Sequence, residues 1–205
     1  YKSCNAYFAN VFKRTIEKYN KPRFGVDAWS AHMKSFGLGN FMGYDLPPGR
    51  KGHIPTSRYY DRWYPNGGWK STTIISNSIG QGEVTMTPIQ LANMMATIAN
   101  EGYYYTPHVI RKIEKHKIDK KFTTKHQTTI DKQYFPPVIQ GMFDVYNKGT
   151  ASRLQVQGIE ICGKTGTVQN PHGADHSVFV AFAPRHNPKI AIAVVVENAG
   201  YGSTW

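Results

Sequence analysis

The stretch GIEICGKTGTVQN, residues 158–170, decides how the rest of the chain is interpreted. As a bare pattern, Gly158 to Thr165 satisfies GxxxxGK[ST], the phosphate-binding loop of NTPases. Such a loop needs a flexible glycine-rich turn followed by a helix. Here the loop positions hold Ile-Glu-Ile-Cys, which favours a strand, and the GTVQNPHG that follows leads into a turn. We therefore predict a strand over residues 158–168, with Lys164 and its threonines towards the end.

Two more strands are predicted after this one. Residues 177–183, SVFVAFA, and 189–197, KIAIAVVVE, are rich in β-branched and aromatic side chains, and the PRHNP between them is typical of a turn. Three consecutive strands with short connections favour an antiparallel meander.

The earlier part of the chain is mainly helical. Apolar spacing predicts helices over residues 6–19 and 136–148, and we expect Asp27 to cap a helix that ends at Gly37. The first two helices should pack together. Thr87-Pro88-Ile89-Gln90 combines a Thr N-cap, a proline in the first turn and a capping-box glutamine, so a helix should start there and stop at Gly102. Residues 41–82 are rich in Pro and Gly and predict a long irregular, functional segment.

Helices that precede strands indicate an α+β fold. We expect a single domain whose residues 1–102 form a mainly helical lobe. Residues 103–205 should supply a hairpin, a helix and the strands of the core sheet.

Composition narrows the possible partners without choosing one. Lys and Arg total 25 against 13 acids, a net charge of +12, which suits nucleic acid, anionic lipid or an acidic cell-wall polymer. The two cysteines, Cys4 and Cys162, are too few for a disulfide scaffold or a zinc site, and whether they pair stays open. We expect neither a metal nor a cofactor. The sequence contains no run of about 18 apolar residues, the length needed to span a membrane.

Two segments leave alternatives open. The pattern of residues 103–122 predicts strands or a hairpin. From Arg111 to Lys125 there are seven Lys or Arg and only two acidic residues. This segment is therefore either a solvated hairpin or a docking surface for an anionic partner. Residues 58–69, RYYDRWYPNGGW, interleave aromatics with arginines, which suits either nucleic-acid binding or packing inside a lobe.

Hydroxyl groups and cations gather at three places: Ser3-Cys4-Asn5 before a helix, Lys164-Thr165-Gly166-Thr167 on a strand, and the SIGQGE loop at residues 78–83. Ser3 and Asn5 also fit as ordinary helix N-caps. Gly166 between two threonines suggests that another backbone or a ligand approaches closely. A lysine in a strand implies a site that accommodates its charge.

The chain resembles the class B penicillin-binding transpeptidases in three respects: the Ser-x-Asn motif, the Lys-Thr-Gly motif and the sequences that flank them. The similarity covers nearly the whole chain, and the SIGQG form resembles the elongation-specific branch known as penicillin-binding protein 2. The resemblance implies the serine β-lactamase/transpeptidase-like fold, an antiparallel sheet flanked by helices with a helical lobe.

The resemblance also implies roles for individual residues. Ser3 would relay a proton, Asn5 would hydrogen-bond the substrate amide, and Lys164 would keep the cleft positive and support the relay. Thr165 and Thr167 would present hydroxyls to the terminal carboxylate of a D-alanyl-D-alanine stem peptide. The backbone N–H of Thr167 would supply half of an oxyanion hole. The substrate would lie along the edge of the strand, where Gly166 leaves room for it.

One motif of the family is missing from these residues. The nucleophilic serine belongs to Ser-x-x-Lys, and none of the ten serines has a lysine three residues later. We expect that motif, the first strands of the sheet and a membrane anchor to precede Tyr1. A catalytically inactive relative that binds peptidoglycan or a partner is the alternative.

The partners implied by the resemblance are peptidoglycan stem peptides, β-lactam antibiotics and the rod-shape glycosyltransferase, and they do not include nucleic acid. The implied location is the extracytoplasmic side of the inner membrane. Whether His172, Asp175 and His176 take part in chemistry stays open, because histidines beside a turn are commonly surface groups.

Overall fold

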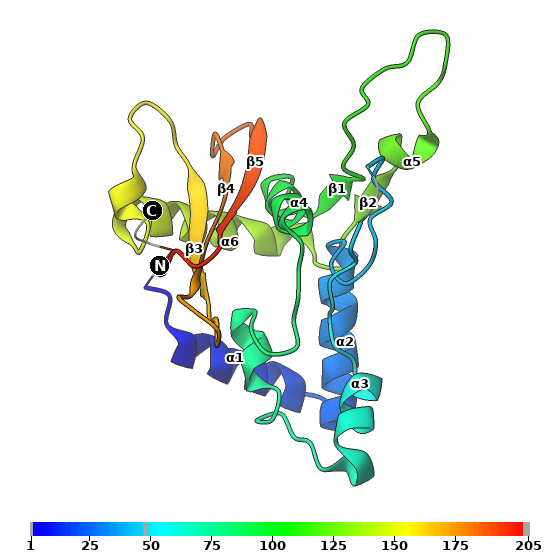
Figure 1. The fold of residues 1–205 in the computed structure, drawn as a ribbon, viewed down its shortest axis with the longest axis vertical. Helices are drawn as coiled ribbons and strands as arrows, with labels where there is room; N and C mark the ends of the chain where they lie inside the picture. The colour runs from blue at the N-terminus through cyan, green and yellow to red at the C-terminus, as the bar shows by residue number, and fades with distance from the viewer. Residues whose placement is uncertain (1, 47–48, 203–205) are drawn as a thin grey trace. The chain divides into compact units, whose positions relative to one another are not determined.

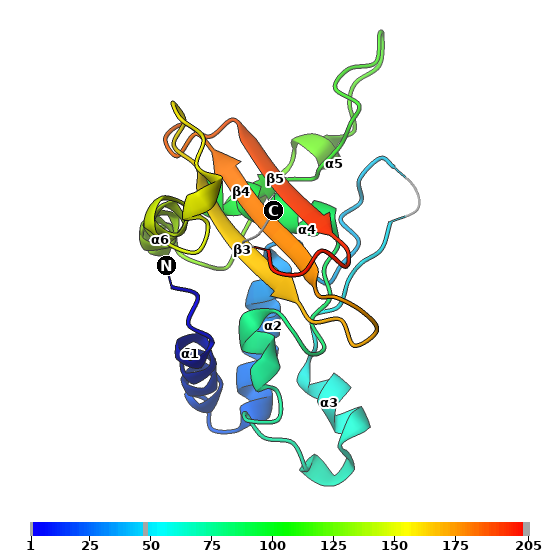
Figure 2. The same cartoon turned by 60° about the vertical axis from the view of Figure 1, so that its left-hand side comes forward.

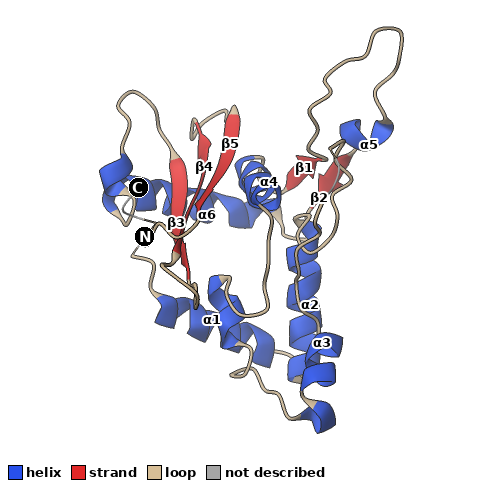
Figure 3. Ribbon diagram, in the orientation of Figure 1, coloured by secondary structure: helices blue, strands red, loops and turns tan. Residues whose placement is uncertain are grey.

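The computed structural model describes residues 2–46 and 49–202. The chain divides into two compact units, which are described separately. The helical unit comprises Cys4–Phe41 and Arg50–Met86, and the sheet unit comprises Tyr1–Ser3, Met42–Gly49 and Thr87–Trp205. Figure 1 follows the elements along the chain, and Figure 3 distinguishes helices from strands.

The helical unit is built on α1 (Asn5–Glu17) and α2 (Pro22–Ser35), which pack together as predicted. Their approach is very close at Gly25, where an added Cβ would lie 2.3 Å from the carbonyl oxygen of Ile16. Only a glycine allows the two backbones to approach so closely. The core between these helices and the following segment is formed by Phe12, Ile16, Val26, Tyr60, Trp69 and Ile74.

The predicted start of the second helix at Asp27 is wrong. The helix begins at Pro22, because proline suits the first turn, where its missing N–H costs nothing. Asp27 instead lies inside α2 and accepts hydrogen bonds from the backbone N and the Oγ of Ser57, at 2.8 and 2.7 Å. Ser57 is the first residue of α3 (Ser57–Trp63), so Asp27 stabilises the start of a different helix.

Within the segment predicted to be irregular, residues 49–82 contain more helix than their Pro and Gly content predicts. They contain α3 and two short 3₁₀ helices, η1 (Pro65–Gly67) and η2 (Ile75–Ile79). The side chain of Tyr60 is fully buried, donates to Glu83 Oε2 at 3.0 Å and accepts from Asn77 Nδ2 at 2.6 Å. Trp69 is buried in the same core. These two aromatics therefore pack inside the helical unit and are not available to stack on nucleic-acid bases.

The sheet unit contains the predicted antiparallel meander. β3 (Cys162–Val168), β4 (His176–Ala183) and β5 (Ile190–Val196) pair in the order β3-β4-β5, as Figure 2 shows. The first strand starts at Cys162 and not at residue 158, because Gly158 takes a left-handed φ of 84° and Ile159 is exposed. The α+β fold class is confirmed.

Two helices cover one face of this sheet. α4 (Pro88–Ala99) packs on β4 and β5, and α6 (Phe135–Lys148) packs on β3. The predicted capping box of α4 is present: Gln90 N donates to Thr87 Oγ1 at 3.4 Å, and Thr87 N donates to Gln90 Oε1 at 3.0 Å. The core beneath these helices is formed by Met95, Met142, Cys162, Val180 and Phe182.

The sequence predicts that residues 88–99 belong to the helical lobe that ends at residue 102. The apolar face of α4 lies against β4 and β5, so the structure groups α4 with the sheet and not with the helical lobe. On the opposite face, the β5 side chains Ile190, Ile192, Val194 and Val196 are exposed.

The basic segment forms a finger, residues 103–127. β1 (Tyr103–Tyr105) pairs with β2 (Lys125–Gln127), and α5 (Lys120–Thr123) precedes β2. Of the strands or hairpin predicted over residues 103–122, only Tyr103–Tyr105 is a strand; residues 106–119 are mostly loop, and the Val109 and Ile110 side chains are exposed. Their backbone N–H groups donate to the carboxylate of Asp45, which lowers the pKa of Asp45 and fixes the base of the finger.

Within residues 2–46 and 49–202, no helix combines the length and apolar character needed to cross a bilayer. In the same residues no three His, Cys, Asp or Glu side chains converge on a point that could hold a metal ion.

Candidate active site

Lys164 lies in the middle of β3, opposite Val180 of β4. Its side chain is half-buried, and burial lowers the pKa of its ammonium group below the usual value for lysine. The ammonium donates to the carbonyl oxygen of Thr165, and among the described residues no carboxylate lies within ion-pair distance of it. A cation kept without an ionic partner is costly, so this position suits recognition of an anion.

A line of three hydroxyl groups ends at Thr165, the residue that follows this lysine in β3. Ser3 Oγ is 3.3 Å from Thr150 Oγ1, and Thr150 Oγ1 is 3.1 Å from Thr165 Oγ1. Thr165 is buried, whereas Ser3 and Thr150 are partly exposed. Hydroxyls can both donate and accept, so the line can carry a proton in either direction.

The alternative explanation of Ser3 and Asn5 as helix caps is wrong. The N-cap of α1 is Cys4, and no side chain caps this end. Ser3 instead has a left-handed φ of 51°, an uncommon conformation for a non-glycine residue. Asn5 is the exposed first residue of α1 and belongs to the helical unit, so its predicted contact with substrate stays a prediction.

The structure therefore brings Ser3 and Thr165 together through Thr150. Within the described part of the chain, the hydrogen bond of the Lys164 ammonium goes to a backbone carbonyl and not to the Ser3 hydroxyl.

Thr150 is the residue that the sequence analysis missed. It follows α6 directly, after Gly149. A Gly-Thr pair at a helix end is usually interpreted as a stop signal, because glycine is common there. The only sequence signal was a hydroxyl at the end of a helix adjacent in the chain to the strand with Lys164.

The two glycines of GKTG have different surroundings. A Cβ at Gly163 would lie 2.8 Å from the Phe179 ring, so packing inside the protein requires glycine there. A Cβ at Gly166 would meet Val178 Cβ at 3.4 Å, an ordinary contact. Packing against Val178 therefore does not require Gly166, and the approach of another backbone or of a ligand stays the predicted explanation.

The phosphate-loop interpretation does not fit the structure. Gly163, Lys164 and Thr165 are in β3, and a turn, not a helix, follows Val168. The SIGQG segment lies at the end of η2 in the helical unit. Gly80 and Gly82 there have φ values of 73° and 70°, which favour glycine.

His172, Asp175 and His176 have structural contacts in and after the turn between β3 and β4. Asp175 Oδ1 accepts from Asn170 N at 3.1 Å, and His172 N donates to Asn170 Oδ1 at 3.0 Å. His176 Nδ1 accepts from Asn198 N at 3.0 Å. These contacts hold the turn and the segment after β5 in place.

The two cysteines are free thiols. Cys4 is exposed, while Cys162 is fully buried, and burial raises the pKa of its thiol to about 11. No disulfide forms between them.

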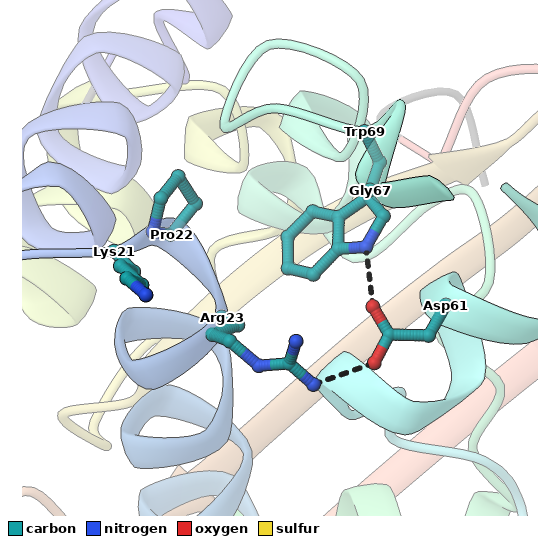
Figure 4. Close-up of a pocket in the computed structure, with 6 residues that line it drawn as sticks. All are labelled: Lys21, Pro22, Arg23, Asp61, Gly67 and Trp69. Atoms are coloured by element: carbon teal, nitrogen blue, oxygen red, sulfur yellow. Dashed lines mark hydrogen bonds and ion pairs between the residues drawn. The ribbon is translucent and has the colours of Figure 1, made fainter. Parts of the chain in front are cut away.

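A pocket of about 180 Å³ in the helical unit contains none of the predicted site residues. Figure 4 shows that Asp61 accepts from the Arg23 guanidinium at 2.6 Å and from Trp69 Nε1 at 3.0 Å. Asp61 thereby links α2, α3 and the segment after η1. The remaining lining residues are Lys21, Pro22 and Gly67.

Comparison with known proteins matches the sequence and fold of this chain to a family. The sequence profile described as penicillin binding protein transpeptidase domain matches residues 1–204. Peptidoglycan D,D-transpeptidase MrdA from Acinetobacter baumannii is 32% identical over 224 residues, covering 98% of this chain and 31% of that protein.

Solved structures of PBP2 proteins have a similar fold over nearly the whole chain. Pseudomonas aeruginosa PBP2 in complex with WCK 5153 has a TM-score of 0.82 at 32% identity, covering 98% of this chain and 42% of that one. Helicobacter pylori PBP2 has a TM-score of 0.79 at 27% identity, covering 99% of this chain and 36% of that one. The chain thus spans about a third of the length of the curated relative. With its profile match, its relatives of the MrdA and PBP2 type and its antiparallel sheet flanked by helices, this chain belongs to the penicillin-binding protein transpeptidase family.

Proposed function

We propose that this chain is part of a peptidoglycan D,D-transpeptidase that cross-links stem peptides during cell-wall elongation and is a target of β-lactams. The observation that carries the proposal is the Ser3-Thr150-Thr165 hydroxyl line, which ends on the same strand as the half-buried cation Lys164. In the described residues β3 pairs with a strand on one side only, so its other edge can accept an extended peptide.

We assign the following roles to the individual residues. The Thr165 and Thr167 hydroxyls and the Lys164 charge bind the terminal carboxylate of a stem peptide ending in D-alanyl-D-alanine. Ser3 and Thr150 pass a proton to the leaving amine, and Asn5 holds the substrate amide. The serine that forms the acyl-enzyme lies outside these 205 residues, since none of their serines is followed by lysine at the third position.

The partners and the location form part of the same proposal. A Helicobacter pylori PBP2 structure is described as a complex with MreC, and another neighbour is described as a peptidoglycan synthase complex that coordinates polymerization and crosslinking. We propose that this protein acts with the elongation glycosyltransferase, on the extracytoplasmic side of the inner membrane, through an anchor outside these residues.

Labelled penicillin tests the proposal. We expect the full-length protein to form a covalent adduct, located by mass spectrometry at a serine outside these residues, and Lys164→Ala to slow its formation by at least about a hundredfold. The 205-residue chain alone should form none.

Two outcomes would contradict this proposal. An adduct at a serine within these residues would show that the nucleophile has been misplaced. If the folded full-length protein bound peptidoglycan but formed no adduct, the inactive binding module would be the correct alternative.

A further inference from the structure

The segment Asn198–Gly202, which follows β5, is tied to the turn between β3 and β4. We call this segment the clamp. The Asn198 side-chain oxygen accepts from Asn170 Nδ2 at 2.7 Å, and Asn198 N donates to His176 Nδ1 at 3.0 Å. Gly200 N donates to the carbonyl oxygen of Asp175 at 2.8 Å, and Ser177 Oγ donates to that of Gly200 at 2.9 Å. Four hydrogen bonds therefore fix the clamp relative to β4 and the turn.

The far end of the clamp lies directly on the strand with the KTGT sequence. A Cβ added to Gly202 would lie 2.0 Å from the carbonyl oxygen of Gly166 and 2.8 Å from that of Val178. Both neighbours are strand backbone, which cannot move aside without breaking the sheet. The φ of Gly202 is outside the left-handed region, so the need for glycine there is steric.

Gly202 also contacts a predicted substrate-binding hydroxyl. Its backbone N donates to Thr167 Oγ1 at 3.3 Å. A hydroxyl that accepts from a fixed N–H has its own proton directed towards the remaining positions around the oxygen. The clamp thus supplies one hydrogen bond to the oxygen of this hydroxyl.

We propose that the clamp orients the Thr167 hydroxyl towards the carboxylate of the ligand, so that Gly202 and Asn198 are positioning residues for carboxylate selectivity. This inference rests on the proposed function. Neither residue touches the substrate: Gly202 acts through Thr167, and Asn198 acts by holding the clamp.

The test compares acylation of the full-length protein by benzylpenicillin and by its methyl ester, followed by mass spectrometry. The two compounds differ only in the charged carboxylate. The wild type should react faster with the free acid. Gly202→Ala should slow the reaction with the free acid about tenfold, because one hydrogen bond to a charged group is lost, and should leave the ester unchanged.

Matched variants separate positioning from general damage. Gly141→Ala changes a helix glycine in the same unit whose Cβ would meet nothing within 4 Å, so it should keep the wild-type ratio. Asn198 has a φ of 56°, which glycine and aspartate both tolerate. Asn198→Gly removes the acceptor for Asn170 and should lower the ratio of the two rates, while Asn198→Asp keeps an oxygen there and should restore it.

The outcomes are distinct. A ratio that stays at the wild-type value in Gly202→Ala, or an equal slowing with both compounds, would overturn the clamp while leaving the proposed function in place. A wild type that reacts with neither compound would contradict the proposed function itself.

Discussion

At the scale of single residues, Lys164 makes opposing contributions to stability and function. Burial lowers its pKa in the folded chain relative to the unfolded one. Between those two pKa values the unfolded chain binds more protons, so stability should increase as the pH rises through that window. Below that window, the folded state bears the full cost of the buried charge.

Lys164→Met should therefore stabilise the protein where Lys164 is charged in both states, at a pH below that window. We expect a gain of about 0.5–2 kcal/mol, the range common for substitutions that relieve such a cost. Urea unfolding measures it, with Lys70→Met, at an exposed position, as the control. A loss of stability in Lys164→Met would mean that the ammonium is satisfied in a way the contacts described here do not explain.

The hydroxyl line gives a second prediction. Thr150→Val keeps the shape of the side chain but removes the link between Ser3 and Thr165. The variant should lose about 1 kcal/mol of stability. In the full-length protein it should slow acylation by penicillin more than Thr72→Val, an exposed control, does. Equal rates for the two variants would argue against a proton relay through Thr150.

At the scale of elements, sequence reasoning succeeded where the signal was local. The Thr87 capping box and the β3-β4-β5 meander depend on neighbours in the chain, and both are confirmed. Asp27 was misjudged because its partner, Ser57, is 30 residues away. Thr150 was missed for a similar reason, since its importance depends on contacts with Ser3 and Thr165 that only the folded chain creates.

The cap of α4 can be tested against a matched position. Thr87→Ala removes a side-chain acceptor from the helix start and should cost about 1 kcal/mol. Thr56, the N-cap of α3, accepts no such bond, so Thr56→Ala should cost less. The urea midpoints of the two variants compare the caps directly. Equal losses would show that the capping box of α4 adds no stability.

At the scale of the whole molecule, the two thiols differ in exposure, so modification of the buried one reports on opening of the sheet unit and modification of the exposed one does not. Cys4 is exposed, whereas Cys162 is buried in the core beneath α4 and α6, with its pKa raised to about 11. A thiol reagent at pH 8 should modify Cys4 quickly and Cys162 only when the sheet unit opens. Counting modified thiols over time in native buffer and in urea measures this difference. Rapid modification of both in native buffer would contradict the packing described here.

The outer side of β5 has a practical consequence for producing the protein. Ile190, Ile192, Val194 and Val196 form an exposed aliphatic row, and in the described residues β5 pairs only with β4. This row lies on the uncovered face of the sheet, on a strand whose outer edge is also unpaired, and such a strand is a template for association between copies. Preparations of these 205 residues alone should therefore lose solubility as the concentration rises, and a lysine at position 192 or 194 is the first change to make for a soluble sample.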